Sequence, residues 1–311
     1  MESIVITEFM DTDAVNALSE HFNVIYDKTL VNHQDKLLEL VADCGAIIVR
    51  NKTQVRGSLL EAAGNLRVVG RLGVGLDNID MEECRRRNIS VIPATGANNI
   101  SVAEYVMAGL LMLARGCYLN GAEVAAGGWP RERMVGGEIC GKTLGLLGFG
   151  GIARDVARRA AACGMKVIAH DPFVPDEAPV WKEYGVPPVA LDAMLAEADA
   201  ISLHVPLNDR TRNLFNAERI AAMKPGAFLI NTARGGIVDE TALAEALRSG
   251  GLGGAMLDVF AAEPLPGGTA LAGAPNCLLT PHIAGVTHES NRRVSAMIAE
   301  KVSAALKGEP A

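Results

Sequence analysis

Residues 143–171 contain the pattern that most restricts how this chain can fold. A short apolar run, Thr143-Leu144-Gly145-Leu146-Leu147, is followed by the turn Gly148-Phe149-Gly150-Gly151-Ile152-Ala153. Apolar residues then recur at helical spacing, and a second apolar run, Lys166-Val167-Ile168-Ala169-His170, ends at Asp171. This order of strand, glycine turn, helix, strand and acid predicts a βαβ unit that binds a dinucleotide.

Each position of the glycine turn has a physical role in that prediction. Gly148 makes the tight turn, Gly150 lets the backbone approach a pyrophosphate, and Ala153 still permits close packing of helix on strand. The backbone N–H groups of Gly151 and Ile152 lie where the helix dipole favours phosphate. The turn is therefore expected to hold the pyrophosphate of the cofactor.

Asp171 predicts which dinucleotide is bound. A carboxylate at the end of the second strand can accept hydrogen bonds from the hydroxyls of the adenosine ribose. The same carboxylate would repel a 2′-phosphate, so NAD is expected rather than NADP.

Length and composition limit the remaining possibilities. The 311 residues suggest two domains, and a net charge of −7 without a dense basic run argues against nucleic acid as a partner. The apolar stretch 105–114 is too short to span a bilayer, and the N-terminus shows no basic leader, so neither a membrane nor a secretory signal is expected. The six cysteines form no C-x-x-C pair; we expect no metal site and interpret them as small core residues of a reduced, cytoplasmic protein.

The glycine turn begins near the middle of the chain, which predicts an inserted domain. Residues 1–100 plus 286–311 are expected to form the substrate (catalytic) domain, and residues 101–285 the NAD-binding Rossmann domain. Alternating strands and helices predict an α/β fold with two Rossmann-like or flavodoxin-like parallel-sheet domains. The further strands are expected at 4–6, 24–26, 46–49, 68–70, 200–204, 227–230, 255–258 and 277–280, and helices at 11–22, 59–64 and 287–306.

The stretch 101–115 predicts a strong helix. Ser101 can cap its N-terminus and Glu104 follows three residues later, which is the pattern of a capping box. The helix is apolar nearly all round, so we expect it to be buried and to take part in a homodimer contact.

Three polar residues follow predicted strands in the second half of the chain: Arg234, Glu263 and His282. The carboxyl ends of parallel strands line the ligand crevice, so these residues can converge there. With their surroundings they resemble the D-isomer-specific 2-hydroxyacid dehydrogenase family, and most of all its 3-phosphoglycerate dehydrogenase branch. The resemblance is carried by 231–240, 257–260, Glu263-Pro264, 281–283, 73–80, 101–105, and, for the branch, by 49–53, 69–75, 128–131 and 141–145. Because the sequence ends after the tail helix, the resemblance implies the short form without a regulatory domain.

The resemblance implies an NAD-dependent hydride transfer with defined roles. His282 would be the acid and base for the hydroxyl proton, because histidine gains and loses a proton readily near neutral pH. Glu263 would hold the other ring nitrogen, and Arg234 would bind the substrate carboxylate with its guanidinium. The backbone N–H groups of Val74 and Gly75 would bind part of that carboxylate.

The resemblance also implies cofactor contacts beyond the glycine turn. Asp258 resembles the position that bonds the nicotinamide carboxamide. Many relatives carry Arg or Lys at position 151; Arg154 can replace that contact but is expected to face solvent. The expected cofactor-binding residues are Val102, Gly148, Gly150, Gly151, Ile152, Asp171, His204, Val205, Pro206, Thr211, Thr232, Ala233, Arg234, Asp258, His282, Ala284 and Gly285.

Three arginines suggest what the substrate carries. Arg50, Arg71 and Arg131 lie where the 3-phosphoglycerate dehydrogenase branch gathers positive charge, Arg131 being expected from a neighbouring subunit. A doubly anionic 2-hydroxy acid is therefore expected, 3-phosphoglycerate first. Sulfolactate fits the same arginines, and glyoxylate or hydroxypyruvate stays open if the arginines are structural or merely solvated.

Two other functions share this scaffold. An NAD-sensing, non-catalytic interaction protein would keep the same polar residues but add partner-binding extensions. Formate dehydrogenase would not need a His–Glu pair, so Glu263 together with His282 argues against it.

Overall fold

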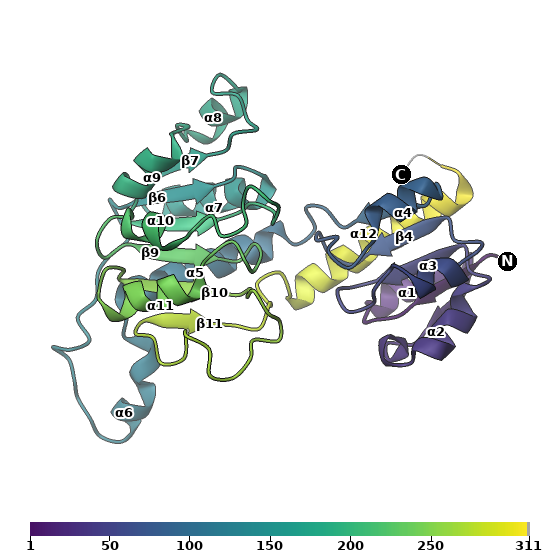
Figure 1. Cartoon of the computed structure of the whole chain (residues 1–311), viewed down its shortest axis with the longest axis horizontal. Helices are drawn as coiled ribbons and strands as arrows, with labels where there is room; N and C mark the ends of the chain where they lie inside the picture. Colours follow the sequence, from purple (N-terminus) through teal and green to yellow (C-terminus); the bar gives the residue numbers. More distant parts are fainter. Residues whose placement is uncertain (310–311) are drawn as a thin grey trace. The chain divides into compact units, whose positions relative to one another are not determined.

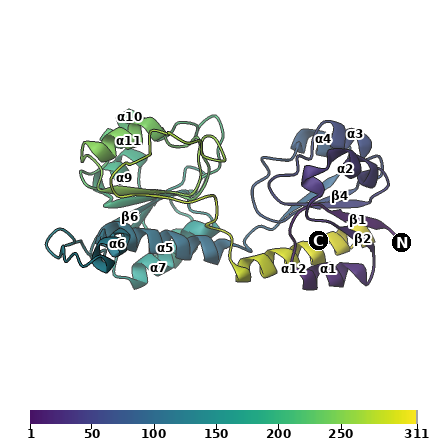
Figure 2. The same ribbon diagram turned by 90° about the horizontal axis from the view of Figure 1, so that it is seen from below.

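The computed structural model describes residues 1–309, which divide into two compact units. The terminal unit consists of Met1–Asn98 and the chain from Val286 onward, and the central unit is the continuous segment Asn99–Gly285. Both are α/β units, drawn in Figures 1 and 2. Within the described residues, no helix is long and apolar enough to cross a membrane.

The terminal unit is built on a parallel sheet of five strands within the described residues. Their order across the sheet is β2 (Asn23–Tyr26), β1 (Ser3–Ile6), β3 (Ala46–Val49), β4 (Val68–Arg71) and β5 (Ser90–Pro93). One face packs on α1 (Thr12–Ser19) and α12 (His288–Lys307), and the other on α2 (Gln34–Val41), α3 (Ser58–Ala62) and α4 (Met81–Arg86) (Figure 2).

Side-chain alternation explains these two layers. Ile4 and Ile6 of β1 belong to the core under α12, whereas Val5 between them belongs to the core under α2. Successive strand residues point to opposite faces, and a strand covered on both faces must be apolar at every position. This is why residues 4–6 of β1 and the whole of β3 are continuous apolar runs rather than alternating ones.

The central unit contains a parallel sheet of six strands within the described residues. The order is β11 (Cys277–Leu279), β10 (Gly254–Leu257), β9 (Phe228–Asn231), β8 (Ala200–Leu203), β6 (Thr143–Leu147) and β7 (Lys166–His170). One face carries α5 (Asn99–Arg115), α7 (Gly151–Ala162) and α8 (Pro179–Tyr184); the other carries α9 (Leu191–Glu197), α10 (Ala217–Ala221) and α11 (Glu240–Arg248). Chain order reverses at β6, which pairs with β7 on one side and β8 on the other.

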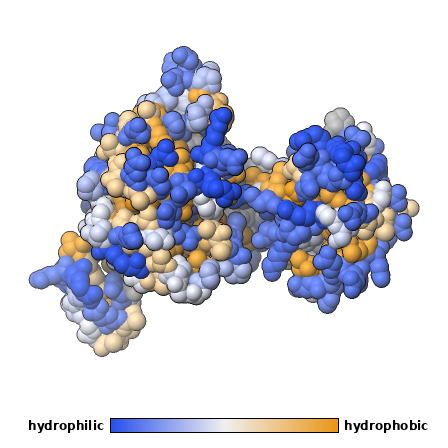
Figure 3. Space-filling model, viewed as in Figure 1, coloured by the Kyte–Doolittle hydropathy of each residue, from blue (hydrophilic) through white to orange (hydrophobic). Residues whose placement is uncertain are grey.

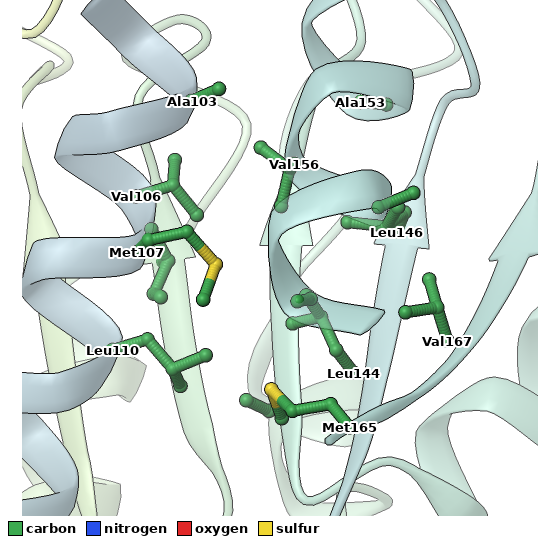
Figure 4. Packing of buried hydrophobic residues seen from close by; sticks show 14 of the residues in the cluster. Ala103, Val106, Met107, Leu110, Leu144, Leu146, Ala153, Val156, Met165 and Val167 are labelled. Carbon is green, nitrogen blue, oxygen red and sulfur yellow. The ribbon is translucent and has the colours of Figure 1, made fainter. Parts of the chain in front are cut away.

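Helix α5 packs tightly on the central sheet. Val106, Met107 and Leu110 face α7 and β6, as the close view in Figure 4 shows. At Gly109 an added Cβ would meet the sulfur of Met256 on β10, so the small residue lets the helix approach the sheet. The apolar character of α5 is therefore largely used inside its own unit.

Two expectations about these segments are wrong. Helix α5 begins at Asn99, so Ser101 lies inside the helix and is buried instead of capping its end. Among the cysteines, Cys44 and Cys84 are core residues, but Cys140 and Cys163 are exposed. Both lie in the connections before β6 and β7 rather than in the strands, which explains their exposure.

Candidate active site

The glycine turn between β6 and α7 has the geometry that its sequence requires. Gly148 has a φ of +86°, and a Cβ there would lie 2.7 Å from the carbonyl oxygen of His204, so only glycine fits without strain. A Cβ on Gly150 would meet nothing within 4 Å, which leaves open space over the turn. Ala153 is fully buried against the sheet. The turn thus touches the end of β8 while its own backbone stays accessible.

Asp171 lies directly beside this turn. Its Oδ2 accepts a hydrogen bond from Phe149 N (2.8 Å) and its Oδ1 accepts one from Phe173 N (3.0 Å). A carboxylate oxygen can accept a second bond, so the anchored group can still receive ribose hydroxyls. Turn and acid, 22 residues apart in the sequence, are brought together.

Arg154 does not face solvent as expected. Its Nε donates to the carbonyl oxygen of Phe149 (2.9 Å), and its guanidinium carbon lies 5.7 Å from the centre of the Phe149 ring. The buried Phe149 ring stacks on Trp181 at 4.6 Å between centroids. The arginine therefore supports the turn from its own helix, because a cation is attracted to an aromatic face and to a carbonyl oxygen.

Two buried polar atoms at neighbouring strand ends have no partner among the described residues. They are Nε2 of His204, after β8, and Oγ1 of Thr232, after β9. Burial of the ring lowers the pKa of His204 to about 4, so the ring is neutral at physiological pH. Buried polar groups without partners are costly, and a bound cofactor with polar edges could pair with them. Together with the open turn, they fit a dinucleotide along the carboxyl edge of the sheet.

The loop after His204 is held by Thr211. The Thr211 hydroxyl donates to the Pro206 carbonyl oxygen (2.6 Å) and accepts from Asn208 N (2.8 Å). Its interactions thus close the loop onto itself; Val205 lies in the same loop and would be 3.0 Å from a Cβ on Gly148. Val102 is buried in α5, and Ala284 is buried just before Gly285 ends the central unit.

His282 and Glu263 form a pair. The ring nitrogen Nδ1 of His282 lies 2.8 Å from Oε2 of Glu263, whose Oε1 accepts from Phe260 N (3.0 Å). A carboxylate only accepts when ionised, so Nδ1 carries the hydrogen and Nε2 is left for chemistry. The His282 side chain is 45% exposed, so a substrate can reach it.

Asp258 organises the segment that carries His282. The buried carboxylate accepts hydrogen bonds from Ile283 N and Ala284 N, both 2.8 Å, and from Thr280 Oγ1 (2.7 Å). Its backbone oxygen accepts from His282 N (2.8 Å). The sequence predicted only a cofactor contact for Asp258. In the structure, three acceptor positions of its carboxylate hold the loop that carries His282.

Arg234 lies in a turn fixed by Asn231, a buried residue that sequence reasoning did not assign to the site. Asn231 Nδ2 donates to the Arg234 carbonyl oxygen (2.8 Å), and Asn231 Oδ1 accepts from Ala233 N (3.0 Å). The next residue, Gly235, has its Cβ direction filled by the carbonyl oxygen of Phe260. The available signal was an asparagine at a strand end with Gly235 four residues later.

In the terminal unit, Arg50 is a half-buried cation. Its Nη2 donates to Asn291 Oδ1 (2.8 Å) and its guanidinium lies 5.7 Å from the centre of the Phe9 ring. Burial lowers the pKa of Arg50, and the negative charge of the nearby Glu8 partly offsets this effect. Within the described residues, no ion pair joins the Arg50 guanidinium to a carboxylate. A cation of this kind is suited to an anionic ligand.

The buried carboxylate of Glu8 holds the loop that begins at Arg50. It accepts from the backbone N–H groups of Arg50 (2.9 Å), Lys52 (3.2 Å) and Thr53 (3.0 Å). Asn78 closes the loop from the other side by donating to the carbonyl oxygens of Arg50 (3.0 Å) and Thr53 (2.7 Å). The sequence did not indicate Glu8 or Asn78 as site residues, because their hydrogen-bond partners are 25 to 45 residues away along the chain.

Other expected substrate residues lie in both units. Arg71 ends β4, and its guanidinium donates to the Leu72 carbonyl oxygen (2.8 Å). Val74 is exposed and Gly75 is half-buried. Arg131 is exposed on the segment after α6 (Gly121–Ala125) of the central unit. In residues 1–309, no group of three or more His, Cys, Asp or Glu side chains could hold a metal ion.

Comparisons with known proteins agree on one family. Residues 107–284 match the family model described as D-isomer specific 2-hydroxyacid dehydrogenase, NAD binding domain. (S)-sulfolactate dehydrogenase of Chromohalobacter salexigens is 54% identical over 98% of this chain and 99% of that protein. D-3-phosphoglycerate dehydrogenase of Methanocaldococcus jannaschii is 40% identical over 99% of the chain, which spans only 58% of that protein. The solved D-lactate dehydrogenase of Aquifex aeolicus, in complex with NAD and lactic acid, has a TM-score of 0.84 at 29% identity, covering 99% and 96% of the two chains.

Proposed function

The chain belongs to the D-isomer specific 2-hydroxyacid dehydrogenase family, and from that premise we propose that it interconverts sulfolactate, or a close doubly anionic analogue, and the matching 2-oxo acid. It is an NAD-dependent 2-hydroxyacid dehydrogenase, since relatives over its whole length are named dehydrogenases or reductases of such acids. A non-catalytic NAD-sensing role is thereby set aside.

The observation that carries the chemistry is the 2.8 Å pair of His282 and Glu263. Bound NAD supplies the hydride acceptor, or as NADH the donor. The chain supplies proton transfer: Nε2 of His282 takes the proton of the substrate hydroxyl in oxidation and returns one to the carbonyl oxygen in reduction. Glu263 fixes the ring orientation and stabilises the imidazolium. Arg234 binds the carboxylate with its guanidinium.

The choice of substrate rests on Arg50 and on the relatives. A half-buried cation without a carboxylate partner is poorly matched to a neutral substrate tail and well matched to a sulfonate or phosphate. Sulfolactate becomes the first candidate instead of 3-phosphoglycerate. The sulfolactate enzyme is similar over nearly its whole length, whereas the chain spans about half of the phosphoglycerate dehydrogenases that it matches.

A substrate panel tests this assignment. NAD reduction is measured with sulfolactate, 3-phosphoglycerate, glycerate and lactate, for the wild type and for Arg50→Met. Sulfolactate should give the highest kcat/KM, and Arg50→Met should lower it by about 100-fold while lactate changes little, because a charge-assisted bond contributes roughly 1.5–3 kcal/mol. Equal losses of kcat/KM for sulfolactate and for lactate in Arg50→Met would contradict the role of Arg50.

The enzyme is also proposed to be a cytoplasmic homodimer, with the contact moved from α5 to the segment that follows it. That segment projects from the central unit (Figure 1), and its surface mixes hydrophilic and hydrophobic residues (Figure 3). Tyr118, Trp129 and Val135 within it are exposed. Exposed apolar side chains of this size favour association with a second copy. The double variant Trp129→Ser, Val135→Ser should have the mass of a monomer in solution, whereas the wild type should have that of a dimer. If the wild type also has the mass of a monomer, the proposal is wrong.

A further inference from the structure

A tyrosine on α5 reaches the catalytic loop through one intermediate hydroxyl. The Tyr105 hydroxyl is hydrogen-bonded to Oγ1 of Thr280, which is bonded to Oδ1 of Asp258 at 2.7 Å. Tyr105 is 175 residues away from Thr280 in the sequence, and none of the expected site residues included either of them.

The direction of these hydrogen bonds can be assigned. An ionised carboxylate only accepts, so the Thr280 hydroxyl donates its hydrogen to Asp258 and must accept from Tyr105. Tyr105 is half-buried, and burial raises the pKa of its hydroxyl, with the charge of Asp258 adding to the rise. Tyr105 therefore stays protonated and remains a donor at physiological pH.

The same Asp258 carboxylate holds both residues that follow the catalytic histidine, Ile283 and Ala284. His282 itself has a φ of +55°, a left-handed conformation that a non-glycine residue keeps only when its surroundings enforce it. Three elements enforce it here: the Asp258 backbone oxygen, the Asp258 carboxylate, and Thr280 on the preceding side of the histidine.

We propose that Tyr105 is a positioning residue for the proton-transfer step, acting through Thr280 and Asp258 to hold His282 in its left-handed conformation against Glu263. The inference rests on the proposed role of His282. The phenol hydroxyl is its essential group: it satisfies Thr280, which can then give its only hydrogen to Asp258. Without it, Thr280 can turn toward another acceptor, and Asp258 loses one of the bonds that shape the loop.

The test separates positioning from packing. Tyr105→Phe keeps the ring and removes only the hydroxyl. Thr280→Val removes the intermediate hydroxyl, whereas Thr280→Ser keeps it. Tyr105→Phe and Thr280→Val should each lower kcat by about tenfold, with KM and the NADH dissociation constant within about twofold, because small misplacements of a reacting group are costly. Thr280→Ser should retain most of the activity. Tyr184→Phe, which removes another tyrosine hydroxyl of the same unit, is the matched control and should be unchanged.

A second readout follows the chemical step. With deuterated NADH, Tyr105→Phe should show a larger primary isotope effect on kcat than the wild type, because a misplaced proton donor makes hydride transfer more rate-limiting. Unchanged kcat and isotope effect in both Tyr105→Phe and Thr280→Val would overturn the inference, as would a parallel rise of the NADH dissociation constant. His282→Gln distinguishes the two proposals: if that variant stays active, the proposed function itself fails.

Discussion

Among single side chains, His204 should make the stability of the enzyme depend on pH. Its pKa in the folded protein is lowered from 6.5 to about 4 by burial, so the unfolded chain takes up a proton in this interval and the folded chain does not. The free energy of unfolding therefore falls as pH drops from about 6.5 to 4, by about 3 kcal/mol for this group.

Denaturant unfolding at pH 7 and pH 4.5 measures this effect. His204→Gln has a polar side chain that does not titrate, so its stability should fall less between the two pH values than that of the wild type. His170, which is hydrogen-bonded to the Val189 carbonyl oxygen at 2.9 Å, gives the control variant His170→Gln. Equal pH dependence in wild type and His204→Gln would contradict the burial argument.

Glu263 should be needed for turnover but not for cofactor binding. Glu263→Gln keeps an oxygen for the N–H of Phe260 but lacks the charge that would stabilise an imidazolium at His282 in the proposed proton transfer. We expect kcat to fall by about 100-fold or more, measured as NADH oxidation with the 2-oxo acid.

Glu240 provides the matched control for that variant. Its carboxylate also accepts a backbone hydrogen bond, from Ala261 N at 2.7 Å, but it contacts no histidine. Glu240→Gln should retain most of the activity, and NADH binding, measured by fluorescence, should be unchanged in both variants. A similar loss of activity in the two variants would reduce Glu263 to a loop-stabilising residue.

Among the elements, α5 contributes most through one face. Leu110 is 1% exposed and packs against α7 and β6, whereas its neighbour Leu111 is 43% exposed. Leu110→Ala should lower the free energy of unfolding by about 2–5 kcal/mol, and Leu111→Ala by no more than about 0.5 kcal/mol, as measured by chemical denaturation. Similar losses would mean that Leu111 is covered, for example by a second copy.

The sheets and their carboxyl edge could be predicted from the sequence because the information is local. Apolar runs between glycines identify the central strands to within a residue or two, and the residues that follow those strands lie at one edge of a parallel sheet. The start of α5 could not be predicted, since Asn99 and Ile100 give no stronger signal than Ser101. Tyr105 could not either, because a lone tyrosine in an apolar helix is indistinguishable from a core residue until Thr280 is placed beside it.

At the scale of the whole molecule, the chain has two units with separate cores, and the proposed function assigns cofactor binding to one and anion binding to the other. The glycine turn, Asp171 and the His282–Glu263 pair belong to the continuous central unit, and Arg50 belongs to the terminal unit. Residues 99–285 expressed alone should therefore fold and bind NADH, since their clusters of buried side chains draw on that unit alone.

Two measurements on that fragment test the division. NADH at 100 times its dissociation constant should stabilise the fragment by about 2.7 kcal/mol, seen as a higher melting temperature, and Asp171→Ala should abolish most of the shift. Oxidation of sulfolactate should be absent, because the fragment lacks Arg50, Arg71 and the backbone of Val74 and Gly75. A folded fragment that oxidises sulfolactate as fast as the full chain would remove the terminal unit from substrate binding, and one that folds without binding NADH would show that cofactor binding needs both units.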